Sequence, residues 1–228
     1  MKTSLLLAIC LATSAGLASS QTFVSQIQTF GGVPNFSQPL VFNKYIGNVS
    51  DITEIQISYV LTINGGLFII DNDALTPATN IVANFGANLD ATSTDVTLLN
   101  ATFQPVIIGA SATNSAVFNL AANQGDGLGD FSPIGPDGAS LVGTTQTSSG
   151  TGNVNSMFFS QFAGGGTFVV NAVGSQIGNL SFNSGIETAT TPVNSLGSLT
   201  IRYTVPEPSS AALLGLGTLA LAIRRRRA

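Results

Sequence analysis

Histidine, cysteine and acidic residues decide which side-chain chemistry this chain could carry out. The chain contains no His, and its single Cys, Cys10, lies in an N-terminal segment that we expect to be removed. Catalytic triads need an imidazole as general base, and ordinary zinc, copper and iron sites need imidazole or thiolate ligands. The sequence therefore predicts no catalytic residue of these kinds and leaves carboxylate chemistry open.

Two groups of aspartates stand where their oxygens could converge on a cation. The first follows an apolar run, and the second belongs to a stretch rich in Gly and Asp. Ca²⁺ is bound by six to eight oxygens, which Asp, Asn and backbone carbonyls supply. Neither group has the spacing of an EF-hand or of a calcium-binding nonapeptide repeat, and the same residue types are ordinary turn formers. The candidate Ca²⁺ ligands are Asp71, Asp73, Asp126, Asp130 and Asp137.

Paired carboxylates could also cleave a glycosidic bond. The chain has no Trp and only three Tyr, so aromatic rings on which sugars stack are scarce. A glycan hydrolase is therefore the least favoured interpretation. We expect no enzymatic activity and no cofactor beyond the candidate Ca²⁺.

Short strands are the elements expected to position these acids. Residues 54–63 alternate apolar and polar side chains, and so do residues 199–205, which is the period of a strand with one face on a core. The Asn-Gly-Gly at 64–66 predicts a hairpin whose second arm is 67–70. Weaker strand signals occur at 22–30, 40–45, 81–85, 96–99, 106–108, 167–173 and 180–182, and the apolar run 157–162 fits a strand or a helical turn.

The part of the chain from 21 to 205 reads as one all-β domain. Thr, Ser, Asn, Gly, Val and Ile dominate it, and helix-forming blocks at helical spacing do not occur. Many short strands separated by turn residues predict an antiparallel β-sandwich or jelly roll. The stretch from Gly143 to Asn155 has no apolar residue before Val154, and we interpret it as a long exposed loop.

Residues 1–20 have the layout of a secretory signal peptide. Lys2 precedes an apolar run, and small residues follow it up to Ser20. This order predicts an N-terminal signal helix that signal peptidase removes between Ser20 and Gln21.

Residues 206–228 form a separate C-terminal signal. Its candidate motif is Val205-Pro206-Glu207-Pro208, in which the Pro-Glu-Pro ends the last strand. A hydrophobic helix is expected from Ala211 to Ile223, and a basic stop follows it, formed by Arg224, Arg225, Arg226 and Arg227. Thirteen helical residues span about 20 Å, short of the ~30 Å hydrocarbon core, so this transmembrane helix suits a transient anchor. The arginines place the tail on the cytoplasmic side and the domain outside.

The charge of the domain is strongly negative. Ten acidic and two basic residues lie within 21–205, a formal charge of −8, against −4 for the whole chain. Such a surface cannot displace the counterions of a phosphate backbone, which argues against nucleic acid as a partner.

The Pro-Glu-Pro, the short apolar run and the arginine cluster together resemble the PEP-CTERM sorting signal of Gram-negative bacteria that make exopolysaccharide. The resemblance implies recognition by an exosortase at the inner membrane and delivery to the cell surface or extracellular matrix, with extracellular polysaccharide, or biofilm, as the surroundings. The domain also resembles the choice-of-anchor E domain, through residues 36–45, the strand 52–59, residues 162–168 and the closing strand. That family has no assigned activity.

Three functions stay open at this point. The leading one is a non-catalytic surface or matrix protein sorted by an exosortase. The second is a Ca²⁺-dependent carbohydrate-binding or adhesion module, and the third is a carboxylate-based glycan hydrolase.

Overall fold

The computed structural model describes residues 21–107, 110–123, 135–182 and 184–206. The predicted signal helix within 1–20 and the predicted hydrophobic helix Ala211 to Ile223 lie outside these residues. The described elements are strands with two short 3₁₀ helices: β1 (Gln21–Gly32), β2 (Phe36–Asn43), η1 (Val49–Asp51), β3 (Glu54–Asn64), β4 (Leu67–Asn72), β5 (Ala78–Thr92), β6 (Ala110–Leu120), β7 (Gly138–Val142), β8 (Gln146–Asn153), η2 (Ser156–Phe162), β9 (Thr167–Leu180), β10 (Ile186–Thr191) and β11 (Asn194–Pro206).

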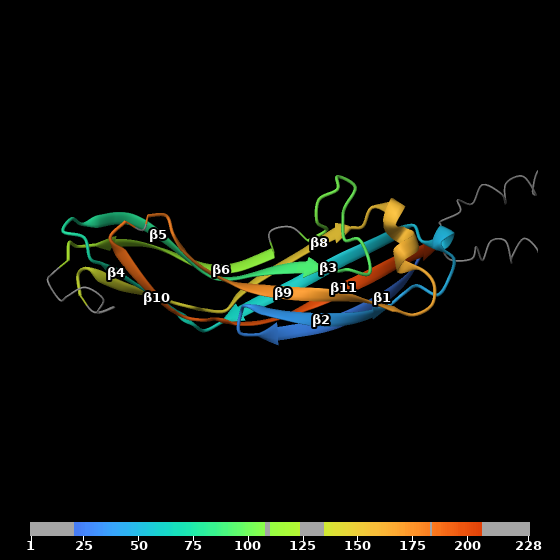
Figure 1. Cartoon of the computed structure of the whole chain (residues 1–228), viewed down its shortest axis with the longest axis horizontal. Coiled ribbons are helices and arrows are strands. Elements are labelled where there is room, and N and C mark those ends of the chain that lie inside the picture. The colour runs from blue at the N-terminus through green and yellow to red at the C-terminus, as the bar shows by residue number, and fades with distance from the viewer. Residues whose placement is uncertain (1–20, 108–109, 124–134, 183, 207–228) are drawn as a thin grey trace, which may run out of the picture.

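The strands form an elongated molecule of two layers (Figure 1). One layer is the continuous sheet β2-β9-β5-β6. The other consists of the sheet β1-β11-β3-β8 and, farther along the molecule, the sheet β10-β4-β7. Aromatic pairs join the layers: the rings of Phe68 and Phe85 stack at 5.8 Å, and those of Tyr45 and Tyr203 lie 5.8 Å apart.

The two sheets of the second layer are one three-stranded sheet interrupted at a common level. The order β11-β3-β8 is repeated as β10-β4-β7, because each strand of one sheet continues along the chain into its counterpart. Asn194 lies opposite Asn64 before the interruption, and Thr191 lies opposite Leu67 after it. The break therefore runs straight across the layer, and the other layer spans it.

Glycine allows the strands to approach one another at this break. Gly66 has a φ of 81°, and a Cβ placed there would lie 2.8 Å from the Phe85 ring and 2.9 Å from the Thr191 carbonyl oxygen. The Gly143 N–H donates to the Gly66 carbonyl at 3.0 Å. A larger residue at Gly66 would be strained in the left-handed conformation, and its side chain would clash with the atoms already there.

A buried amide from the opposite layer satisfies the backbone that the break leaves unpaired. The Oδ1 atom of Asn114, on β6, accepts from the N–H of Thr144 at 3.2 Å and from its Oγ1 at 2.6 Å, while Nδ2 donates to the Thr144 carbonyl at 3.2 Å. Asn114 is buried. Since an unpaired buried polar group is costly, this side chain is part of what makes the interruption stable.

Glutamine side chains close the edge where β1 and β2 lie in different layers. Gln26 Nε2 donates to the Asn43 carbonyl at 2.8 Å, and its Oε1 accepts from the Asn43 N–H at 2.7 Å. Gln28 Nε2 donates to the Val41 carbonyl at 3.0 Å. These amides bond to the backbone of β2 as a neighbouring strand would, so the edge is less open to another chain.

The all-β, antiparallel prediction is confirmed. Residues 54–63 lie in β3, and the expected inward face is buried; the closing strand is confirmed in the same way. The run 157–162 lies in the 3₁₀ helix η2. Buried residues of the predicted faces are Ile55, Ile57, Tyr59, Leu61, Ile63, Leu199, Ile201, Tyr203 and Val205.

One expected connection and one expected strand are wrong. The strand 67–72 does not fold back on β3 but continues beyond it into the next sheet, because Gly65 and Gly66 make a break instead of a reversal. The segment 96–99 is not a strand. Val96 lies in a loop and its side chain is buried, and Leu99 makes only an isolated bridge with Pro105. Residues 106 and 107 are likewise outside any strand.

The predicted loop from Gly143 to Asn155 is also wrong, because most of it is strand β8 paired with β3. A Cβ at Gly150 would lie 2.7 Å from the Tyr59 ring, and one at Gly152 would lie 2.5 Å from the Val106 carbonyl oxygen. The large side chains of other segments therefore fill the inward face of β8, and β8 itself needs no apolar residue there.

We expect Asn114→Ala to reduce the free energy of unfolding by about 2 kcal/mol, because it removes a buried side chain that makes three hydrogen bonds to Thr144. The matched control is Asn119→Ala on the same strand, an exposed residue whose Oδ1 accepts from the Asn80 N–H at 2.8 Å. It should cost less than about 1 kcal/mol. Urea denaturation measures both, and equal losses would contradict the role given to Asn114.

Candidate functional site

The described part of the C-terminal signal is the end of β11. Val205 is buried and Pro206 is exposed, and Pro206 lies opposite Gln21 in the β1–β11 pairing. The domain therefore begins and ends at the same pole. The remaining predicted residues of the signal lie outside the described residues, as does Ser20; they are Glu207, Pro208, Ala211 to Ile223, Arg224, Arg225, Arg226 and Arg227.

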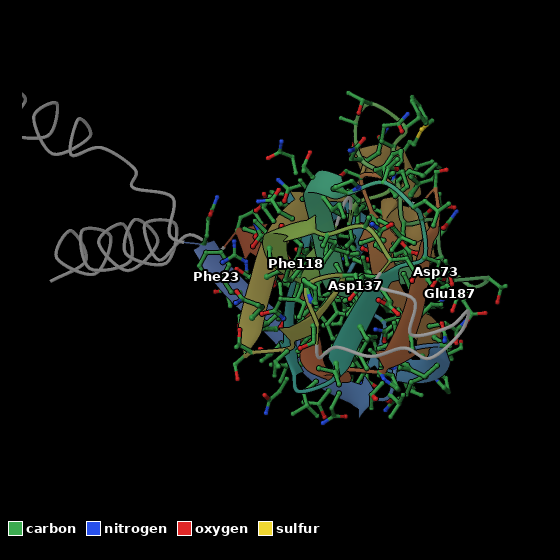
Figure 2. All side chains as sticks on the ribbon, turned by 90° about the vertical axis from the view of Figure 1, so that its left-hand side faces the viewer. Phe23, Asp73, Phe118, Asp137 and Glu187 are labelled. Atoms are coloured by element: carbon green, nitrogen blue, oxygen red, sulfur yellow. The ribbon has the colours of Figure 1, made fainter. Side chains whose placement is uncertain are left out.

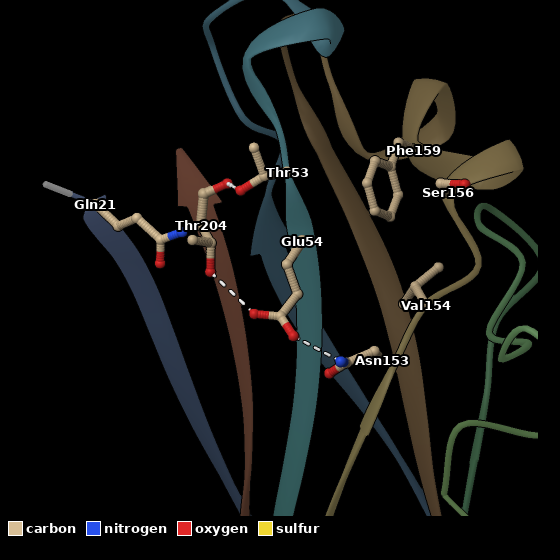
Figure 3. Close-up of a pocket in the computed structure, with 8 residues that line it drawn as sticks. All are labelled: Gln21, Thr53, Glu54, Asn153, Val154, Ser156, Phe159 and Thr204. Atoms are coloured by element: carbon tan, nitrogen blue, oxygen red, sulfur yellow. Dashed lines mark hydrogen bonds between the residues drawn. The ribbon is translucent and has the colours of Figure 1, made fainter. Parts of the chain in front are cut away.

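A cleft of about 380 Å³ opens beside this strand end (Figure 3). Glu54, the first residue of β3, lies between two neighbouring strands there. Its Oε1 accepts from Asn153 Nδ2 at 2.6 Å, and its Oε2 accepts from Thr204 Oγ1 at 3.3 Å. The lining residues are Gln21, Thr53, Glu54, Asn153, Val154, Ser156, Phe159 and Thr204.

Thr53 makes a second connection to the same strand. Its N–H donates to the Thr204 carbonyl oxygen at 2.9 Å, and its Oγ1 donates to that oxygen at 3.0 Å. Thr204 is only 2% exposed, so both its carbonyl and its hydroxyl are bonded within the domain. The sequence did not point to Thr53, Glu54 or Asn153, because the Glu54–Thr204 contact joins positions 150 residues apart.

The cleft offers weak support for acid–base chemistry. Glu54 is the one carboxylate among the residues that line it, and both of its oxygens accept hydrogen bonds from neighbouring side chains. Glycoside hydrolysis uses two carboxyl groups on either side of the bond. The arrangement suits a structural contact between strands.

Three of the candidate Ca²⁺ ligands, Asp71, Asp73 and Asp137, lie at the opposite pole, onto which Figure 2 looks. Asp71 ends the pairing of β4 with β7, and the Asp137 carbonyl accepts from the Asn72 N–H at 3.0 Å. Asp71 and Asp137 are buried, whereas Asp73 is partly exposed. Within the described residues, no three acidic, His or Cys side chains are grouped so that they could hold a metal ion. Asp126 and Asp130 lie outside those residues.

The comparisons bear on the C-terminal segment. The family model described as the PEP-CTERM protein-sorting motif matches residues 204–227. The chain carries a PEP-CTERM sorting motif. This motif implies export and exosortase-type sorting to the surface, with processing by an exosortase during export. The match covers the end of the chain and leaves the domain before it unassigned.

The remaining comparisons assign nothing further. No curated protein matches the chain. Among solved structures, it is similar to the VP2 subviral particle of infectious bursal disease virus, at 11% identity over 89% of this chain and 49% of that chain, with a TM-score of 0.12. The structure of the Gx strain of that virus gives 12% identity over 89% and 49%, with a TM-score of 0.13. The chain spans about half the length of these viral proteins, and scores this low carry no argument.

The apolar run in the sequence predicts a short hydrophobic helix after the domain. Among the helices that the structure describes, none has the length and apolar character needed to cross a bilayer. The expected helix, Ala211 to Ile223, lies beyond the last described residue and stays a prediction.

Tyr203 fixes the end of β11 to the other layer from inside. It is fully buried, and its hydroxyl donates to the Asn43 carbonyl on β2 at 3.3 Å. Burial raises the pKa of the Tyr203 phenol above its ordinary value, because the phenolate would be poorly solvated there.

This shift predicts a loss of stability at alkaline pH. A pKa that is higher in the folded state gives stability that is fully present below the unfolded value, near 10, and is lost as pH rises above it. Denaturation between pH 8 and about 11 should therefore show a decline that Tyr203→Phe reduces. Tyr59→Phe is the comparison variant, and an equal effect of both substitutions would contradict the assignment.

Proposed function

We propose that this protein is a non-catalytic surface or matrix protein of a Gram-negative bacterium, delivered by an exosortase and held among extracellular polysaccharide. The observation that carries the proposal is the PEP-CTERM match at residues 204–227, which starts within the last strand of an all-β domain. The signal peptide within 1–20 and the helix Ala211 to Ile223 supply entry to the export route and a transient hold on the inner membrane.

The length of the apolar run supports a temporary anchor. At 1.5 Å per residue, its thirteen residues make a helix of about 20 Å, against a hydrocarbon core of ~30 Å. A helix this short must thin the bilayer or tilt its flanking residues toward the surface. Removal of the tail by the sorting enzyme relieves that mismatch.

A neutral, hydroxyl-bearing sheet face supports a polysaccharide environment. Thr147, Ser149, Thr151 and Asn153 are exposed at alternate positions of β8. Hydroxyl and amide groups exchange hydrogen bonds with sugar hydroxyls without requiring a charged ligand. The absence of His from the sequence and the single carboxylate in the cleft support a role without catalysis.

Replacing Pro206, Glu207 and Pro208 with alanine tests the sorting step. We expect the full-length variant to accumulate unprocessed in the membrane fraction, because the recognised sequence is gone, while the wild type reaches the surface. Ser209→Ala with Ser210→Ala is the control, since it alters the same linker and keeps the motif. Immunoblots of membrane, surface and medium fractions measure the distribution, and wild-type processing of the alanine variant would contradict the proposal.

A Ca²⁺-dependent carbohydrate-binding or adhesion module is the second candidate. The observation that favours it is the burial of two carboxylates, Asp71 and Asp137, at neighbouring strand ends. If it holds, calorimetry of the processed protein with Ca²⁺ gives heat that Asp126→Ala with Asp130→Ala abolishes. Asp51→Ala, an exposed acid elsewhere, should leave the heat unchanged. No heat from the wild type would reject this candidate.

A further inference from the structure

The sorting motif and the folded domain share residues. The PEP-CTERM match begins at Thr204, whereas β11 continues to Pro206. The first three residues of the matched segment are therefore strand residues, paired with Gln21, Thr22 and Phe23 of β1. An enzyme that recognises this segment meets part of it inside a sheet.

The shared residues are held by side chains as well as by strand pairing. Thr53 donates twice to the Thr204 carbonyl, and Glu54 accepts from the Thr204 hydroxyl. We call Thr53 and Glu54 the clasp. Glu54 is itself positioned by the 2.6 Å hydrogen bond from Asn153 on β8. Thr204 is 2% exposed and Val205 is 8% exposed, so the start of the motif is closed to a binding partner in the folded domain.

The linker between the domain and the apolar run is short, so it cannot hold the motif away from the domain. Four residues separate Pro206 from Ala211, where the apolar run begins. Even a fully extended chain covers less than about 20 Å over this interval. An enzyme acting at the membrane must therefore approach the motif directly beside the pole of the domain that contains the clasp.

We propose that the clasp controls processing: the end of β11 must leave Thr53 and Glu54 before the motif can be processed. The inference rests on the proposed function, since it concerns the sorting step, but it adds that the domain restrains its own sorting. Strand ends open locally with a smaller free energy than global unfolding requires. When opening is fast relative to processing, the processing rate follows the population of the open form.

Weakening the clasp should speed processing. Glu54→Ala removes the acceptor of the Thr204 hydroxyl, and the loss of one hydrogen bond to a charged group raises the open population about tenfold. We therefore expect precursor to convert to processed protein about tenfold faster in a pulse-chase of the full chain in its exosortase-bearing host. Thr53→Val should act in the same direction.

The control for this arm is Thr62→Val. Thr62 is also on β3, and its Oγ1 lies 3.0 Å from Thr147 Oγ1, a hydrogen bond far from the end of β11. It should change the conversion rate less than twofold. A control that accelerates processing as much as Glu54→Ala would overturn the proposal, because general destabilisation would then explain both.

Locking the strand end tests the same idea without weakening the fold. Thr22 and Val205 are directly paired, so Thr22→Cys with Val205→Cys places two thiols within reach of a disulfide in the oxidising compartment. The sequence has no Cys after Cys10 that could compete. We expect the doubly substituted precursor to accumulate while the disulfide is intact. After a reductant opens the disulfide, the same protein should be processed at the rate of Val205→Cys alone, which separates the lock from any effect of the substitution on recognition.

The arms separate failure of the inference from failure of the proposed function. If the wild type is not converted at all, or if its conversion survives alanine at Pro206, Glu207 and Pro208, the proposed function fails and the inference with it. If conversion needs the motif but the disulfide-locked protein is processed at the wild-type rate, only the inference is overturned. Slow processing of the locked protein together with fast processing of Glu54→Ala supports it.

Discussion

Backbone pairing on both sides of β11 is the interaction on which the rest of the structure depends. The last strand of the domain lies between β1 and β3, so twelve residues of β1 and eleven of β3 find their partners on it. Its inward side chains, Leu199, Ile201 and Tyr203, are buried against the other layer. Without β11, β1 would have no neighbour in its sheet, and the core would be open along its length.

The break in the three-stranded layer gives the molecule its length. Long strands accumulate twist along their length, and a shared interruption lets each half of this layer adjust separately to the layer opposite. Gly66 supplies the close approach, and Asn114 supplies the hydrogen bonds that the interruption removes from Thr144. The two poles are thereby separated: one contains both domain ends, and the other contains the buried aspartates.

Local patterns predicted the parts of the fold that local chemistry determines. The alternation in 54–63 and 199–205 identified two strands and their buried faces, since one face of each meets the core. Strand β8 could not be found in this way, because Gly150 and Gly152 contribute space while Tyr59 and Val106 contribute the contacts. The break was missed for a related reason: it depends on the register of strands distant in sequence.

In the candidate site, too, local features could be predicted from the sequence, whereas contacts between distant residues could not. The motif at Pro206-Glu207-Pro208 is contiguous and could be recognised from the sequence. Its overlap with the fold depends on Thr53 and Glu54, which precede Thr204 by 151 and 150 residues. The five aspartates illustrate the opposite case, since residue type alone suggested a cation site and the described residues do not group three ligands.

The direction of β11 has a mechanical consequence. The strand runs along the long axis of the molecule and ends at Pro206 (Figure 1). Under the proposed function, the tail that follows Pro206 holds the protein at the membrane. Drag on the far pole while the tail is held would pull along this strand, and its hydrogen bonds to β1 and β3 would be loaded together in shear instead of one after another. A domain tethered at that residue resists force with the whole length of its central strand.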